Sequence, residues 1–240
     1  MGNKPYLYPY SEEEAKRRHK LPLWLRSHDA NVDCKKAIDK AIQDHFDGMH
    51  LTDGCINEVI AEFGYKRTAW VLSNTLQQKS WDGRFRPSNV KWAKQTYIPP
   101  DPHNTDFVAE SHPAVLDGFV TMYRSAYQAL GLFGPEHCEP DSFAELDYEG
   151  KILVLSPDTL NESYWSPENQ LWLAHDGFGC SPKATGRSIH CTCLGDGEQT
   201  RWNRTDFIGV LQDQYLPAWA REILESLREQ RQDMGGMHMT

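Results

Sequence analysis

The stretch "QQKSWDGRFRPSNVKWA", residues 77–93, places cationic and aromatic side chains around an Asp-Gly turn. Cations beside aromatic rings are the ingredients of a surface that binds single-stranded nucleic acid. The candidate contact residues are Trp81, Arg84, Arg86, Lys91 and Trp92. The competing interpretation is structural: Asp82-Gly83 forms a turn, Ser88 caps the next helix, and both tryptophans pack in the core. We favour the structural interpretation and keep the two arginines as candidate contacts for an acidic partner.

Imidazole and carboxylate groups recur in "HFDGMHLTD", residues 45–53, and such groups can bind zinc or a harder divalent ion. The four residues are His45, Asp47, His50 and Asp53. Their spacing matches no established metal signature. Each also has a structural interpretation, because Asp47-Gly48 can end one helix and Asp53 can cap the next. We therefore predict no metal site here, and no cofactor.

The six cysteines offer a second route to metal binding or to nucleophilic catalysis. Cys191 and Cys193, with Cys180 or His175, could hold zinc, but structural zinc sites prefer two to four residues between the sulfurs. We expect reduced thiols in ordinary hairpin packing. The sequence has no G-x-S-x-G, no glycine-rich phosphate loop and no H-E-x-x-H motif. The sequence identifies no catalytic residues. If the chain is an enzyme, its active site must be assembled from residues that are distant in the sequence.

Charge divides the chain. Residues 1–100 contain 16 Lys and Arg against 12 Asp and Glu, a net charge of +4, whereas residues 101–240 contain 9 against 22, a net charge of −13. The run 131–150 contains six acids and no Lys or Arg, and these are Glu136, Glu139, Asp141, Glu145, Asp147 and Glu149. An acidic surface of this kind can approach a basic partner. A solvated acidic loop is the simpler interpretation.

The elements that position these residues are predicted to be helices in the N-terminal part of the chain and a mixture of strands and helices in the C-terminal part. Apolar periodicity and capping residues predict helices that begin at Ser11, Asp29, Thr52 or Asp53, Lys66, Ser88 and Ser111. Gly64 is expected just after the end of the third of these. Residues 151–156 predict a buried strand, residues 187–194 and 199–204 a β-hairpin, and residues 216–231 a helix.

The predicted fold class is α+β: a helical N-terminal bundle followed by a small mixed α/β domain with a β-hairpin. We divide the chain into a helical domain over 1–100, a proline-rich linker with a long helix and an acidic loop over 101–147, and a C-terminal domain over 148–240. No apolar leader and no run of about 18 apolar residues is present. We expect a cytoplasmic protein without a membrane segment.

Three strings, "YPYS", "FDGMHL" and "NTLQQKSWDGRF", resemble an uncharacterised family of domains of unknown function carried by conjugative transposons and related mobile elements of Gram-positive gut bacteria. The resemblance spans roughly residues 6–100. Residues 155–220, with "PENQ", "GFGC" and "DGE", are similar to a short domain associated with large polyvalent proteins. These resemblances imply element transfer or protection from host defences, including inhibition of CRISPR nucleases, and they carry over no catalytic residues.

We therefore expect a non-enzymatic accessory protein of a mobile element that binds and inhibits a host defence nuclease of the CRISPR type. Its partner would be a host protein, and its acidic second part would face that partner. One alternative is a nucleic-acid-binding accessory factor of element transfer that uses the 77–93 stretch. A second alternative is a hydrolase or modifying enzyme whose site is not written as a local motif.

Overall fold

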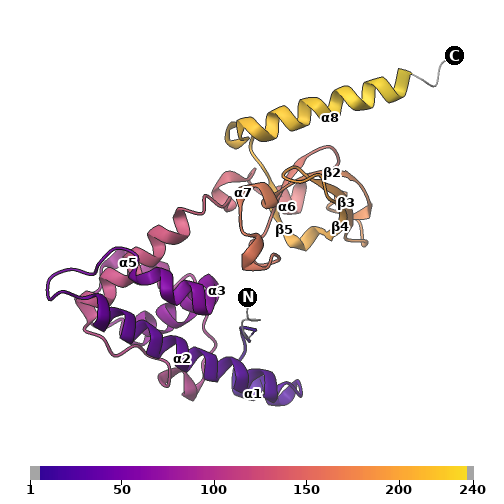
Figure 1. The fold of residues 1–240 in the computed structure, drawn as a ribbon. Coiled ribbons are helices and arrows are strands. Elements are labelled where there is room, and N and C mark those ends of the chain that lie inside the picture. Colours follow the sequence, from indigo (N-terminus) through magenta and orange to yellow (C-terminus); the bar gives the residue numbers. More distant parts are fainter. Residues whose placement is uncertain (1–5, 237–240) are drawn as a thin grey trace. The chain divides into compact units, whose positions relative to one another are not determined.

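The computed structural model describes residues 6–236 and divides into two compact units, Met1–Ala129 and Leu130–Thr240. Each unit is described by itself. Helices form the first unit and an antiparallel sheet forms the centre of the second, so the predicted α+β class is confirmed (Figure 1). The sequence-based boundaries at residues 100 and 147 stay predictions. None of the described helices combines the length and the apolar content needed to cross a membrane.

The first unit consists of five α-helices and one 3₁₀-helix within its described residues. They are α1 (Glu12–Arg17), α2 (Leu21–His45), α3 (Cys55–Gln78), α4 (Pro87–Ala93), η1 (Pro102–Thr105) and α5 (Pro113–Gln128). Helix α2 begins earlier than Asp29 because Pro22 lies in its first turn, where a missing N–H costs nothing. Gly64 has a φ of 83° and a ψ of 168°, non-helical values that separate α3 into two helical segments at a kink, so the predicted helix end at Gly64 is confirmed.

The helix starts separate correct from incorrect capping predictions. The Ser11 hydroxyl accepts a hydrogen bond from the Glu14 N–H, as predicted. The predictions for Ser88 and for Thr52 or Asp53 are wrong. Helix α4 follows Arg86 with Pro87 in its first turn, and α3 follows Gly54, which has a φ of 88°. Neither helix has a side-chain cap, because a proline and a left-handed glycine make the turns instead.

Buried aliphatic and aromatic side chains from α2, α3 and α5 form the core of the first unit. Fully buried members are Ile38, Leu72, Leu76, Leu116 and Phe119. Helices α2 and α3 supply the main packing, and α5 lies against both. The 79–86 and 99–112 segments between the helices are attached to this core through buried Phe85, Phe107 and Ala109.

The second unit is built on a five-stranded antiparallel sheet with strand order β4-β3-β2-β1-β5. The strands are β1 (Ile152–Leu155), β2 (Leu171–Asp176), β3 (Ser188–Cys193), β4 (Gln199–Asn203) and β5 (Phe207–Val210). Strands β3 and β4 pair from Ser188 opposite Asn203 to Thr192 opposite Gln199, which confirms the predicted hairpin. Short helices connect the strands: η2 (Pro135–His137), α6 (Ser142–Glu145), η3 (Glu162–Tyr164), α7 (Pro167–Gln170), η4 (Phe178–Cys180), η5 (Arg204–Asp206) and η6 (Asp213–Tyr215).

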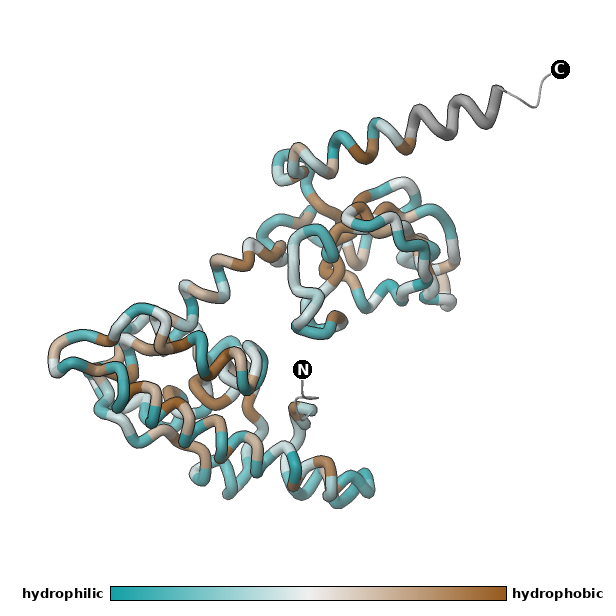
Figure 2. The backbone as a smooth tube through the Cα atoms, viewed as in Figure 1, coloured by the Kyte–Doolittle hydropathy of each residue, from teal (hydrophilic) through white to brown (hydrophobic). Residues whose placement is uncertain are grey.

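Both faces of the sheet are covered. Leu153 and Leu155 of β1 pack in one cluster with Trp172, whereas Val154 between them packs in a second cluster. The second cluster includes Ala220 and Leu224 of α8 (Ala218–Gly236), so α8 covers that face. Figure 2 shows hydrophobic residues along the central strands, as expected when alternate side chains are buried on both sides.

Candidate functional site

The stretch at 77–93 forms a tight turn between α3 and α4. The Phe85 N–H donates to the Asp82 carbonyl at 3.3 Å, so the predicted turn is present. Trp81 is 81% exposed, Lys91 is exposed, and Trp92 is half-buried with its ring 5.6 Å from that of Tyr123. The expectation that both tryptophans pack in the core is therefore wrong for Trp81, which faces solvent as Lys91 does, whereas Trp92 packs against the core of the first unit.

The two arginines of this stretch already have carboxylate partners. Arg84 binds both oxygens of Asp82, with Nε–Oδ1 2.9 Å and Nη2–Oδ2 2.6 Å. The Arg86 Nε lies 3.1 Å from Oδ2 of the buried Asp117. These ion pairs reduce the positive charge that the stretch presents to a phosphate backbone.

The Asp82–Arg84 pair predicts a specific pH response. Hydrogen bonds from the Arg84 side chain and main chain lower the pKa of the Asp82 carboxyl from 3.8 to about 2. Because the folded-state pKa is depressed, the stability contributed by this pair is complete above pH 3.8 and is lost as pH falls toward 2. A carbon-13 NMR titration of the Asp82 carboxyl should show a midpoint near 2, and Arg84→Ala should raise the midpoint toward 3.8.

Lys91→Ala is the matched control, because it removes an exposed cation of the same stretch that forms no ion pair with Asp82. It should leave the Asp82 midpoint unchanged. A wild-type midpoint near 3.8, or an equal change in the two variants, would contradict the role assigned to Arg84.

The residues of 45–53 shape a loop and do not converge on an ion. The His45 Nδ1 lies 2.8 Å from the Thr52 hydroxyl, and Asp47 Oδ1 accepts the N–H groups of Met49 and His50 at 2.8 and 2.7 Å. Those two hydrogen bonds lower the pKa of the Asp47 carboxyl. The second alternative, an enzyme, thereby loses the residues that the sequence offered for it.

All six cysteines are buried thiols. Burial raises the pKa of Cys34 and Cys191 to about 12 and that of Cys193 to about 11. The Cys191 thiol donates to the Ile189 carbonyl and the Cys193 thiol to the Glu168 carbonyl, so the two sulfurs have separate partners. Nucleophilic catalysis and zinc binding both need a thiolate, which this environment disfavours.

The structure brings together a cluster that sequence analysis did not select: His28, His103 and Asp106. Asp106 Oδ2 lies 3.1 Å from His28 Nε2 and 3.0 Å from His103 Nδ1. One ligand atom from each residue lies within 4.8 Å of the others, and within residues 6–236 no other group of three or more such side chains does so. The hydrogen bond to Asp106 raises the pKa of His103.

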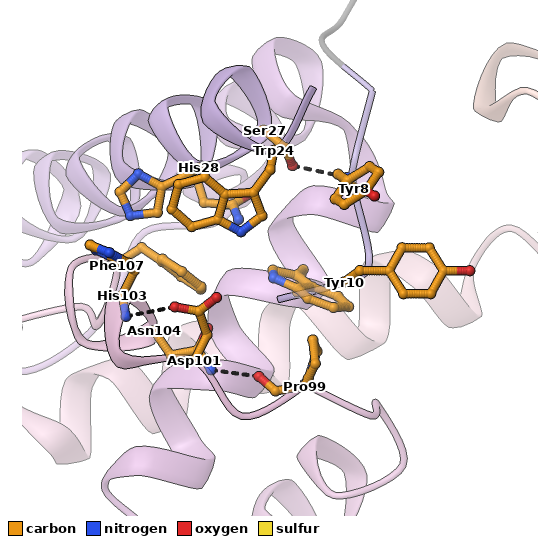
Figure 3. Close-up of a pocket in the computed structure, with 12 residues that line it drawn as sticks. Tyr8, Tyr10, Trp24, Ser27, His28, Pro99, Asp101, His103, Asn104 and Phe107 are labelled. Carbon is orange, nitrogen blue, oxygen red and sulfur yellow. Dashed lines mark hydrogen bonds between the residues drawn. The ribbon is translucent and has the colours of Figure 1, made fainter. Parts of the chain in front are cut away.

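Helix α2 and the η1 segment position these three side chains. The Trp24 ring stacks on His28, one turn away on α2, with centroids 5.0 Å apart and an angle of 18°. The Asp101 carboxylate accepts the His103 N–H at 2.9 Å and so begins the η1 turn (Figure 3). The only local sign in the sequence is the H-x-x-D spacing of His103 and Asp106, because His28 is 75 residues away from His103.

A cavity of about 20 Å³ adjoins His28 and His103 (Figure 3). Tyr8, Trp24 and Asp101 also line it. The Tyr8 hydroxyl is buried and has no hydrogen-bond partner among the residues that the structure describes. A volume of this size holds a water molecule, and the polar lining favours one.

Comparison with protein families matches residues 7–128, about half of the chain, to the family described as "Protein of unknown function (DUF3849)". The chain belongs to this family. The DUF3849 region covers helices α1 to α5 and thus contains both the 77–93 stretch and the His28–His103–Asp106 cluster. No curated protein and no solved structure matched the chain.

The acidic run lies outside the DUF3849 region, in the second unit. All six acidic residues named in the sequence analysis are exposed. Glu136 lies 3.5 Å from the His137 ring, and no described lysine or arginine forms an ion pair with the other five. Asp147 and Glu149 line a surface hollow of about 420 Å³ together with Phe178, which is 79% exposed. The run therefore combines unpaired negative charge with an exposed aromatic ring.

Proposed function

We propose that this chain is a stoichiometric protein binder whose acidic run docks on a basic surface of a host defence nuclease of the CRISPR type. The observation that carries the proposal is the rigid support of the run. Its main chain is attached to the sheet unit by hydrogen bonds from Glu139 N–H to the Val210 carbonyl at 2.8 Å and from Tyr148 N–H to the Cys180 carbonyl at 3.0 Å. The Ser142 hydroxyl also accepts the Val210 N–H.

The support of the run by the sheet unit favours a binding surface over a solvated loop. Carboxylates that imitate a nucleic-acid backbone must hold fixed positions, because ordering a mobile loop on binding costs conformational free energy. Arg204 holds the main chain of the run in place, because its guanidinium donates hydrogen bonds to the carbonyls of Ser142, Phe143 and Leu146. Carboxylates that have no cationic partner and are held in place in this way are complementary to a positively charged nucleic-acid channel.

The biological setting belongs to the same proposal. The string resemblances to mobile-element proteins, and that of residues 155–220 to domains associated with large polyvalent proteins, support a setting in which anti-defence proteins occur. The alternative of nucleic-acid binding through the 77–93 stretch has less support, because carboxylates already pair with Arg84 and Arg86. Trp81 and Lys91 are the residues left to test it.

The test is a DNA-cleavage assay with a purified CRISPR nuclease and its guide RNA, in which the full chain is titrated against the nuclease. Cleavage should stop near equimolar protein, and inhibition should weaken with added salt. The variant Glu145→Gln/Asp147→Asn/Glu149→Gln should lose about 10- to 100-fold in inhibitory potency, at about 0.5–1 kcal/mol for each exposed charge pair.

The matched control is Asp213→Asn/Glu222→Gln/Glu225→Gln, which removes the same charge from exposed positions of the second unit outside the run. It should inhibit like the wild-type chain. Equal losses in both variants would show that only net charge matters and not the run. Absence of inhibition across CRISPR nucleases of the host would overturn the proposed function, and binding to the labelled guide RNA alone would favour the nucleic-acid alternative.

A further inference from the structure

We propose that His28, His103 and Asp106 form a zinc-binding site in the first unit. Two imidazole nitrogens and one carboxylate oxygen are a ligand set that zinc prefers, whereas magnesium and calcium prefer oxygen alone. The Asp106 oxygen lies 3.1 Å from His28 Nε2 and 3.0 Å from His103 Nδ1. Ligand atoms around a tetrahedral zinc ion lie about 3.3 Å apart for bonds of about 2.0–2.1 Å, so small side-chain shifts would admit the ion.

The remaining nitrogens of both imidazoles face carboxylates. His28 Nδ1 lies 3.8 Å from Asp29 Oδ1, and His103 Nε2 lies 3.8 Å from Glu12 Oε2. A zinc-bound imidazole usually donates its other N–H to such an acceptor, which sets the tautomer and orients the ring. The stacking of Trp24 on His28 restricts that ring further. At 3.8 Å neither carboxylate forms a hydrogen bond to its imidazole, so each acts on the ring through its charge.

A small cavity lies beside the two histidines of the cluster, and Asp106 does not line it. The cavity of about 20 Å³ is lined by both histidines and by Tyr8, whose hydroxyl has no described hydrogen-bond partner. A cavity of this volume holds one water molecule, and solvent would supply the fourth ligand of the ion. Three protein ligands with one open position is also the arrangement of catalytic zinc sites. This cluster is consequently where the hydrolase alternative would have its chemistry.

The site would connect parts of the chain that are distant in sequence. His28 belongs to α2 and His103 to η1, and Asp106 directly follows η1. Glu12 of α1 adds its N–H to the Asp101 carboxylate at 2.6 Å, so α1 is held at the same place. Binding of one ion to the folded chain would stabilise this part of the first unit, since the ligands are dispersed in the unfolded chain.

The experiment measures zinc binding by isothermal titration calorimetry at pH 7.5, with the full chain free of affinity tags and treated first with a chelator. We expect one zinc ion per chain and a higher unfolding temperature with zinc. Asp106→Asn keeps the side-chain shape and should weaken zinc binding at least tenfold, as should His28→Gln. His50→Gln is the matched control, because His50 lies in the 45–53 loop outside the cluster.

Cobalt(II) identifies the ligands, because it substitutes for zinc and absorbs visible light. The cobalt complex should show d–d bands without the charge-transfer band that a thiolate ligand produces. Circular dichroism of each metal-free variant checks that it folds. One ion per chain, lost in Asp106→Asn and kept in His50→Gln, supports the site. No binding, equal binding by all variants, or a thiolate band would overturn it, whatever the outcome of the nuclease assay.

Discussion

Replacing Arg204 with alanine is expected to destabilise the second unit by about 3–5 kcal/mol, because several buried carbonyls lose a charged donor. Arg204 is fully buried, yet it has no carboxylate partner among residues 6–236. Its guanidinium instead donates hydrogen bonds to five main-chain carbonyls, those of Ser142, Phe143, Leu146, Gly179 and Cys180. It also lies over the Tyr148 ring, 3.6 Å from the centroid. Alanine would remove a cation–π contact and a donor from each of these carbonyls. Outside the regular helices and strands of residues 6–236, only the carbonyls of Ser142 and Cys180 also accept a main-chain N–H.

Urea denaturation of the full chain, followed by circular dichroism, measures the effect. Arg204→Lys should also destabilise the second unit. The planar guanidinium of arginine carries five N–H donors, whereas the lysine ammonium carries three and cannot reach all five carbonyls. Arg201→Ala is the matched control: Arg201 is an exposed arginine on β4, three residues earlier, and its loss should change the unfolding free energy by less than about 0.5 kcal/mol. Similar losses in Arg204→Ala and Arg201→Ala would show that the buried guanidinium does not organise this unit.

The Arg204 result bears on function as well as on stability. Three of the five carbonyls belong to 142–146, inside the acidic run. An Arg204→Lys chain that still folds should therefore inhibit a nuclease less well, since the carboxylates of the run would lose their fixed positions.

Replacing Asp117 with alanine should destabilise the first unit by about 2–3 kcal/mol. Asp117 is buried on α5, and its Oδ1 accepts the Arg86 N–H at 2.9 Å and the Asn89 side-chain amide at 2.8 Å. Its other oxygen pairs with the Arg86 guanidinium. The carboxylate thus substitutes for the missing side-chain cap at the start of α4. Without it, the Arg86 N–H loses its acceptor and the buried Asn89 amide loses one of its acceptors.

Two further variants separate the main-chain contact from the ion pair. Arg86→Ala should cost at most about 1 kcal/mol, because the Arg86 side chain is 61% exposed and solvent screens its charge. Asp117→Asn should fall between the two, since its amide oxygen can still accept from the Arg86 N–H. Thermal unfolding of the three variants gives the order. If Arg86→Ala were as damaging as Asp117→Ala, the surface ion pair and not the helix start would be the important contact.

The amino-acid sequence by itself determined the features that depend on near neighbours. Periodicity and a serine cap specified α1 and the helical character of the first unit, and alternation with a short turn specified the β3–β4 hairpin, because helix and hairpin contacts span few residues. The exposure of the six carboxylates from Glu136 to Glu149 was also predictable, since unpaired charges avoid burial. The Asp82-Gly83 turn was predictable for the same reason, since its hydrogen bond joins Asp82 and Phe85, three residues apart.

Only the tertiary structure decided the long-range polar contacts. His28 meets His103 and Asp106 across 75 and 78 residues, Asp117 reaches Arg86 across 31, and Arg204 reaches Ser142 across 62. It also replaced the expected cap at Ser88 with a carboxylate from another helix. No local pattern marks such partners, because a side chain's hydrogen-bond partner depends on how whole helices and strands pack. The same local motif can meet partners at many different distances along the sequence.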